Sequence, residues 1–139
     1  MNVQLDGEIV ALDDAGRPDF HRLSARMLHG KDGIAVRYFV FDVLACEGGA
    51  TTHLPYEERR QLLEALEIDG PHWQTVATFD DGRALFTVVC DSGLEGVVAK
   101  RLRDPYLEGG RLWVKTKNRA TARFAEERAR ATVSRRVAV

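Results

Sequence analysis

Four strand-like segments, separated by segments with helical spacing, constrain the fold of this chain most strongly. The strand-like segments are rich in apolar and β-branched residues and lie at 3–12, 34–44, 94–101 and 112–117. Helical patterns lie at 20–28, 55–66 and 83–91, and a short strand is expected at 73–78. Strands that are polar on one face and apolar on the other favour antiparallel pairing. We therefore expect an α+β (mixed α/β) fold, with a largely antiparallel sheet flanked by helices.

Composition limits the classes of function. The chain has 139 residues, of which 45% are hydrophobic and 29% are charged, and its formal net charge is -1. This length and composition fit one globular domain, and nucleic acid would have to bind through a local basic patch. No apolar run approaches the roughly 20 residues of a membrane span. Two cysteines, and four histidines without metal-ligand spacing, predict neither a disulfide framework nor a zinc site. With no secretion signal, a cytoplasmic location is the simplest expectation.

A pair of lysines near the end of the last strand-like segment is the first candidate site. Strand alternation places Trp113, Lys115 and Lys117 on one face and Val114 and Thr116 on the other. Two neighbouring ammonium groups repel each other unless they face water or an anion. The pair fits a solvated edge strand, because lysine commonly protects exposed edges. Two convergent lysines also fit a phosphate site, which is the second interpretation.

Single carboxylates in apolar strands are the second candidate. Glu8 lies among apolar residues of the first strand-like segment, and Glu95 directly precedes Gly96 in the third. Such carboxylates must face solvent, a cation or a partner. Magnesium takes few protein oxygens and completes its shell with phosphate and water, so both residues are candidate metal ligands. Phe41 fits either a core residue or an aromatic platform for a ligand.

The order of four short motifs carries more information than any one of them. They are Leu-Asp-Gly-Glu-Ile-Val (5–10), Phe-Val-Phe-Asp-Val-Leu (39–44), Leu-Glu-Gly-Val-Val-Ala-Lys-Arg (94–101) and Trp-Val-Lys-Thr-Lys (113–117). In this order they closely resemble the later motifs of the covalent nucleotidyltransferases. Within that superfamily the chain resembles a bacterial ATP-dependent DNA ligase of the end-joining type. Asp104-Pro105-Tyr106 also resembles the Ser-Pro-Tyr common there, with Asp in place of Ser.

This resemblance covers Leu5 to about Asn118 and implies a partial, ATP-grasp-like adenylation domain. It implies that Phe41 stacks on adenine and that Glu8 contacts the ribose or helps to place a metal. It implies that Glu95 binds the catalytic Mg²⁺ or Mn²⁺. Lys115 and Lys117 would contact the α-phosphate of ATP and stabilise the charge that develops as pyrophosphate leaves. Nicked duplex DNA is the implied partner, although related RNA ligases and capping enzymes share the motif order.

The nucleophile of the family does not occur in this sequence. In the family it is a lysine in a Lys-x-Asp-Gly motif that becomes covalently adenylated. Lys31-Asp32-Gly33 lacks the intervening residue and is interpreted as a turn. We expect a truncated ligase domain at 1–118, a basic helix and tail at 119–139, and no OB-fold domain. The helix is expected at 120–131, either solvated or in contact with nucleic acid.

Three functions remain open on these grounds. The chain is a ligase-like protein that is inactive alone, a non-catalytic nucleotide- or DNA-binding module, or one part of a split ligase gene. In the third case a second chain supplies the missing lysine.

Overall fold

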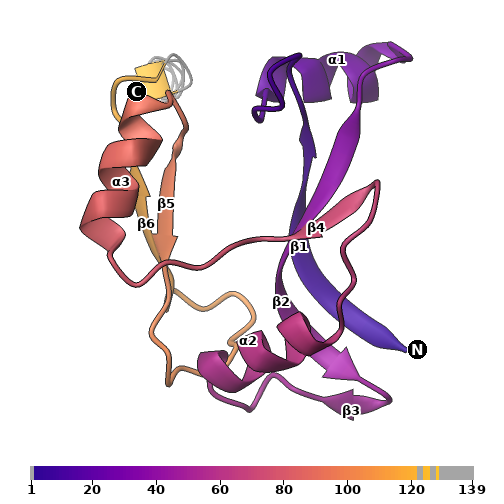
Figure 1. Cartoon of the computed structure of the whole chain (residues 1–139), viewed down its shortest axis with the longest axis vertical. Coiled ribbons are helices and arrows are strands. Elements are labelled where there is room, and N and C mark those ends of the chain that lie inside the picture. Colours follow the sequence, from indigo (N-terminus) through magenta and orange to yellow (C-terminus); the bar gives the residue numbers. More distant parts are fainter. Residues whose placement is uncertain (1, 122–123, 126–127, 129–139) are drawn as a thin grey trace, which may run out of the picture. The chain divides into compact units, whose positions relative to one another are not determined.

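The computed structural model describes residues 2–121, 124–125 and 128, which divide into two compact units. Unit 1 comprises Met1–Ala77 and Arg101–Gly110, and unit 2 comprises Thr78–Lys100 and Arg111–Val139. The chain therefore leaves unit 2 after Lys100, contributes one loop to unit 1 and returns at Arg111. Figure 1 traces the elements of both units in chain order. No helix in the described ranges has the length and apolar character needed to cross a membrane.

The sheet of unit 1 is built around strand β2 (Val36–Cys46). β2 pairs antiparallel with β1 (Val3–Ala11) and with the two-residue β3 (Gly49–Ala50), and parallel with β4 (Trp73–Thr75). The expectation of a mixed α/β fold with largely antiparallel pairing is confirmed, with β2–β4 as the parallel exception. β3 was not predicted from the sequence, because a two-residue strand has no periodicity to recognise.

Two helices belong to unit 1 (Figure 1). Helix α1 (Phe20–His29) begins after its cap residue Asp19, whose carboxylate accepts the Arg22 N–H at 3.1 Å. It ends at Gly30, which is in the left-handed conformation with φ 59° and directly precedes the turn predicted at Lys31-Asp32-Gly33. Helix α2 (Tyr56–Ala65) follows Pro55, close to the predicted start.

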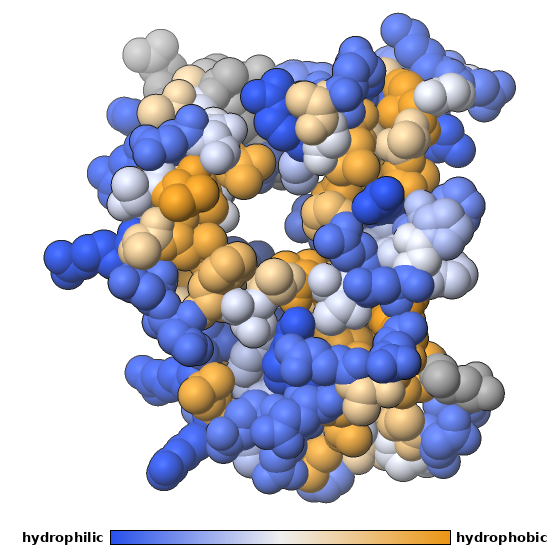
Figure 2. Space-filling model, in the orientation of Figure 1, coloured by the Kyte–Doolittle hydropathy of each residue, from blue (hydrophilic) through white to orange (hydrophobic). Residues whose placement is uncertain are grey.

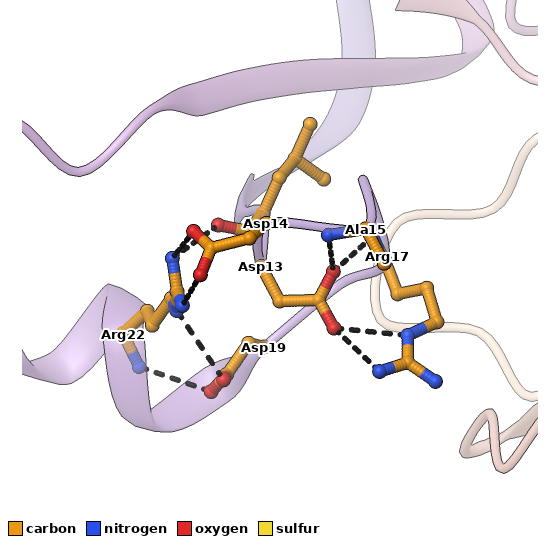
Figure 3. Close-up of polar contacts among 7 residues, drawn as sticks. Asp13, Asp14, Ala15, Arg17, Asp19 and Arg22 are labelled. Carbon is orange, nitrogen blue, oxygen red and sulfur yellow. Dashed lines mark hydrogen bonds and ion pairs between the residues drawn. The ribbon is translucent and has the colours of Figure 1, made fainter.

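The turn that leads into α1 is held by two arginine–aspartate pairs (Figure 3). Arg17 contacts Asp13 at 2.9 Å, and Arg22 contacts Asp14 at 2.9 Å. The Arg17 N–H, the leading cause, lowers the pKa of Asp13, and the Arg22 side chain lowers the pKa of Asp14. These solvent-exposed pairs fix the local turn, since exposed ion pairs add little to global stability.

The core of unit 1 lies between β2 and α2. Val40, Val43 and Leu63 are completely buried, and β1 and the segment after α2 add the partly buried Leu5 and Ile68. By contrast, α1 contains no buried residue, and its Met27 and Leu28 are 70% and 76% exposed. Figure 2 shows hydrophobic residues in orange, interspersed with hydrophilic residues in blue, on one face of the surface. The apolar spacing of α1 therefore predicted the helix, although it does not mark a buried face.

The main elements in the described part of unit 2 are helix α3 and one strand pair. Helix α3 (Gly82–Asp91) begins at Asp81, whose carboxylate accepts two backbone N–H groups. Strands β5 (Gly96–Ala99) and β6 (Val114–Lys117) pair antiparallel. Both are shorter than the segments expected at 94–101 and 112–117. Of the basic helix expected at 120–131, the structure describes only 120–121, 124–125 and 128, and Phe124, Ala125 and Arg128 are helical.

Candidate functional site

Unit 1 carries two of the predicted site residues on neighbouring strands. Glu8 is an exposed residue of β1, opposite Phe39 of β2. Phe41 is a half-buried residue of β2 and lies where the register changes. Asp42 pairs with Asp6 and Val40 pairs with Gly7, which makes Phe41 the additional residue of a β-bulge. A bulge changes the direction of a side chain from the regular alternation of the strand. Phe41 therefore has no partner residue in the register of β1 and departs from that alternation.

Gly7 of the Asp-Gly-Glu motif allows the two strands to approach closely. A Cβ at this position would lie 2.5 Å from the Phe39 carbonyl oxygen and 2.8 Å from the Tyr38 ring. The Tyr38 hydroxyl also donates to the Leu5 carbonyl at 3.2 Å. Glycine is therefore required here by space, and the tight contact fixes β1 immediately before Glu8.

A buried ion pair lies directly beside the bulge. Arg59 of α2 donates to both carboxylate oxygens of Asp42, from Nε at 2.7 Å and from Nη2 at 3.0 Å. Their side chains are 1% and 0% exposed. Arg59 Nη1 also donates to the Leu54 carbonyl at 2.6 Å. A bidentate pair with further hydrogen bonds offsets the cost of burying two charges, and it joins β2 to α2 next to Phe41.

This pair was not predicted from the sequence, although a signal was present. Tyr56, Arg59 and Leu63 follow helical spacing and are the buried residues of α2. Asp42 lies within the apolar run of β2. A charged residue inside each apolar pattern indicates a buried pair, since an unpaired buried charge is strongly unfavourable.

Unit 2 carries the other three predicted site residues on one strand pair. Lys115 and Lys117 lie on β6 opposite Val98 and Gly96, and all four residues of β6 are exposed. Glu95 immediately precedes β5 and is exposed as well. Directly opposite residues of an antiparallel pair share a face. The lysine pair therefore lies over Gly96 and Val98, as strand alternation predicted for the two lysines.

Gly96 brings β5 and β6 together at the lysine pair. Its φ is 154°, and a Cβ there would lie 2.2 Å from the Thr116 carbonyl oxygen. Only glycine has both the space and the conformational freedom for this position. The neighbouring strand itself thus requires a glycine at this position.

Asn118 closes the same end of the strand pair and was not predicted. It is buried, its N–H donates to the Glu95 carbonyl at 2.7 Å, and its Nδ2 donates to the Leu94 carbonyl at 3.0 Å. These bonds extend the register of β5 and β6 by one residue pair, so Asn118 fixes the backbone of Glu95 next to Lys117.

The opposite end of this pair is closed by Lys100 and Trp113. The Lys100 Nζ lies 3.7 Å from the centroid of the Trp113 ring. This distance indicates a cation–π contact. Lys100 is therefore a specific partner of the Trp113 ring.

The predicted site is therefore divided between the units. Unit 1 brings Glu8 and Phe41 onto paired strands, and unit 2 brings Glu95, Lys115 and Lys117 onto another pair. Among the described residues, no three His, Cys, Asp or Glu side chains form a group that could enclose a metal ion. One or two carboxylates that share an ion with phosphate and water fit the coordination of Mg²⁺. Glu8 of unit 1 and Glu95 of unit 2 are both exposed, and each is compatible with that mode as a single carboxylate ligand.

Comparison with known proteins shows which family the chain resembles. The model of the "ATP dependent DNA ligase domain" matches residues 1–117. The chain is 34% identical over 103 residues to the SPbeta prophage-derived DNA ligase-like protein LigB of Bacillus subtilis, covering 73% of this chain and 38% of that protein. It is 40% identical over 105 residues to the multifunctional non-homologous end joining protein LigD of Pseudomonas aeruginosa, covering 73% of this chain and 12% of LigD.

Solved structures agree with the sequence relatives. Mycobacterial DNA ligase D complexed with ATP and MES superposes with a TM-score of 0.69 and 35% identity, over 83% of this chain and 38% of that one. The chain thus spans well under half the length of the relatives described above. The match to the family model nevertheless includes all four motifs. The chain belongs to the ATP-dependent DNA ligase domain family.

Proposed function

We propose that this chain is the nucleotide-binding part of an ATP-dependent DNA ligase that seals nicks in repair or recombination through adenylate intermediates. The observation that carries the proposal is the β5–β6 pair. Gly96, where the neighbouring strand leaves no space for a side chain, lies opposite Lys117, and Val98 lies opposite Lys115. Two exposed ammonium groups on one face are suited to bind an anion, and the family membership supports the α-phosphate of ATP as that anion. The ATP held by the mycobacterial relative supports this choice of ligand.

In this proposal each unit supplies different chemistry. The ring of Phe41 stacks on adenine, and Glu8 contacts the ribose or helps to place a metal. Lys115 and Lys117 bind the α-phosphate and stabilise the negative charge that develops as pyrophosphate leaves. Such transfer depends on positioning and on cations directed at developing charge, and this chain contains residues for both tasks.

A divalent metal, Mg²⁺ or Mn²⁺, is expected to be held by Glu95, with Glu8 as a second candidate ligand. When bound, the ion would neutralise phosphate charge and polarise the phosphoryl oxygens. Glu95 is suited to this task because its backbone is fixed by Asn118 while its side chain remains exposed.

The covalent step sets a limit on what these 139 residues do alone. They contain no Lys-x-Asp-Gly, and the lysine of that motif is the expected nucleophile. Incubation of the chain with Mg²⁺ and ATP labelled at the α-phosphate is expected to give no labelled band after denaturation. A stable labelled band would contradict the proposal. Addition of a second polypeptide that carries the missing motif is expected to restore labelling if the chain is one part of a split ligase.

The second candidate function is a non-catalytic binding module for nucleotide or DNA. Calorimetry with ATP and AMP distinguishes these cases, since nucleotide binding is expected to be lost in Phe41→Ala. Binding of nicked duplex DNA that falls steeply with salt, and is lost on truncation after Asn118, would support the DNA-binding module instead. The arginines expected to hold DNA in that case lie largely outside the described residues.

A further inference from the structure

The loop Arg101–Gly110 connects β5 to β6 of unit 2 but packs within unit 1. The cap residue of α2 makes no side-chain hydrogen bond to the helix. The loop replaces such a cap, because the Tyr56 N–H donates to the Asp104 carbonyl at 3.0 Å and the Glu57 N–H donates to the Leu102 carbonyl at 2.9 Å. The first-turn N–H groups of a helix need outside acceptors, so the loop completes the start of α2.

Tyr106 fixes the same loop to strand β1. Its N–H donates to the Thr52 carbonyl at 2.8 Å, and its hydroxyl donates to Asp6 Oδ2 at 2.8 Å. Its ring centroid lies 5.8 Å from the guanidinium carbon of Arg59. Burial, and secondly the bond to Asp6, raise the pKa of Tyr106 to about 12. The hydroxyl therefore remains a proton donor throughout the neutral range.

The two carboxylates that these groups hold are direct neighbours. Asp6 of β1 pairs with Asp42 of β2 in the sheet register. Like charges directly opposite each other destabilise a strand pair unless each has its own donor. Arg59 donates hydrogen bonds to Asp42 at 2.7 and 3.0 Å, and the Tyr106 hydroxyl donates one to Asp6. Loss of the Tyr106 hydroxyl would leave Asp6 opposite Asp42 without this donor.

Strand β1 has little freedom to absorb such a change near Asp6. The next residue, Gly7, lies so close to the Tyr38 ring that a Cβ would be 2.8 Å from it. Glu8 follows immediately, opposite Phe39. A displacement of Asp6 is therefore transmitted along β1 to Glu8.

We propose that Tyr106 is a positioning residue, whose hydroxyl holds Asp6 and thereby sets the place of Glu8 on β1. As far as it concerns the nucleotide, the inference rests on the proposed function. It assigns a task to the tyrosine of Asp104-Pro105-Tyr106, a hundred residues from the carboxylate that it holds.

Removal of one oxygen atom tests the proposal. In Tyr106→Phe the Kd for AMP, measured by calorimetry on the full chain, is expected to rise about fivefold, the effect of roughly one lost hydrogen bond. The backbone amide resonances of Gly7 and Glu8 are expected to move in the chain without nucleotide. In an Asp6→Ala background, Tyr106→Phe is expected to change neither quantity further. An undiminished effect in that background would overturn the proposal.

Tyr38→Phe is the matched control. It also removes one tyrosine hydroxyl that donates to β1, at the Leu5 carbonyl, but it leaves Asp6 and Tyr106 intact. Its Kd for AMP is expected to stay within about twofold of that of the unaltered chain. An equal rise in both variants would mean a general loosening of β1 and would contradict a positioning role.

The proposed function can fail separately from this inference. If the unaltered chain does not bind AMP, the proposed function is wrong, and the amide resonances alone decide the role of Tyr106. Movement of the Gly7 and Glu8 resonances in Tyr106→Phe, and its absence in the Asp6→Ala background, would support that role. Unchanged resonances in Tyr106→Phe would overturn it.

Discussion

The two strand pairs that carry the predicted site residues are built in opposite ways. The β1–β2 pair contains Val40, Val43 and Asp42, all essentially buried, and is joined to α2 by the Arg59 ion pair. The β5–β6 pair has no buried residue within its strands, and all of β6 is exposed. Side-chain packing therefore fixes Glu8 and Phe41, whereas backbone contacts fix Glu95 and the lysines. The difference is consistent with their proposed tasks, since an aromatic platform needs a rigid support and a phosphate site needs exposed cations.

The largest effect is expected from the ion pair of unit 1. Arg59→Ala leaves the Asp42 carboxylate buried and unpaired, which costs about 3–5 kcal/mol of unfolding free energy. Urea unfolding followed by circular dichroism measures this loss. The double variant Asp42→Ala with Arg59→Ala is expected to lose less than the sum of the two single variants. If the two single losses of unfolding free energy add up to the loss in the double variant, the Arg59–Asp42 pair does not stabilise unit 1 through a direct interaction.

A backbone change should disrupt unit 2 most strongly. Gly96→Ala places a Cβ at 2.2 Å from the Thr116 carbonyl oxygen at a φ of 154°, and is expected to cost about 2–3 kcal/mol. Amide resonances of β6 should be lost or shifted while those of β1 and β2 remain. Gly82→Ala is the control, because nothing lies within 4 Å of its added Cβ. If both variants behave alike, the close approach at Gly96 is not what holds the strands.

The same truncation at two valines tests the difference in packing. Val40 is completely buried in β2, and Val114 is 60% exposed in β6. Val40→Ala is expected to lower the unfolding free energy by about 1.5–2 kcal/mol through lost burial, and Val114→Ala by less than about 0.5 kcal/mol. Chemical denaturation of the two variants measures both. Equal losses would mean that the two strand pairs are equally packed.

The smallest effect is expected at alkaline pH in unit 1. The pKa of Tyr106 is raised to about 12 in the folded chain, above the value of about 10 for an exposed tyrosine. A raised pKa means that the folded chain holds the proton more tightly. The stabilisation is then complete below pH 10 and is lost between about pH 10 and 12. Thermal unfolding in that range should show a smaller loss of stability in Tyr106→Phe than in the unaltered chain, although Tyr38 and Tyr56, whose pKa values are also raised, continue to contribute.

The sequence predicted the parts of this chain that depend on local patterns. Apolar periodicity located β1, β2 and the helices. It did not reveal which side chains meet across the fold. The bonds from Arg59 to Asp42 and from Tyr106 to Asp6 span 17 and 100 residues, and no repeating pattern encodes such distances. The bulge at Phe41 was missed for a similar reason, because register is set by both strands together.

The site residues were predicted from motif order, and their division between two units was not. A motif names a residue type at a position, but it does not state which compact unit that position joins. Arg101–Gly110 shows this most clearly, since its flanking strands belong to one unit and its own contacts to the other.

A paired titration with adenosine and AMP tests the central claim most directly. Adenosine has the base and ribose but no phosphate, so Phe41→Ala is expected to weaken both ligands about tenfold, through lost stacking. Lys115→Ala is expected to weaken AMP about tenfold, through one lost charge-assisted bond, and to leave adenosine unchanged. This pattern would assign the base to unit 1 and the phosphate to unit 2. Equal losses of adenosine and AMP in Lys115→Ala, or no binding of either ligand to the unaltered chain, would contradict the account.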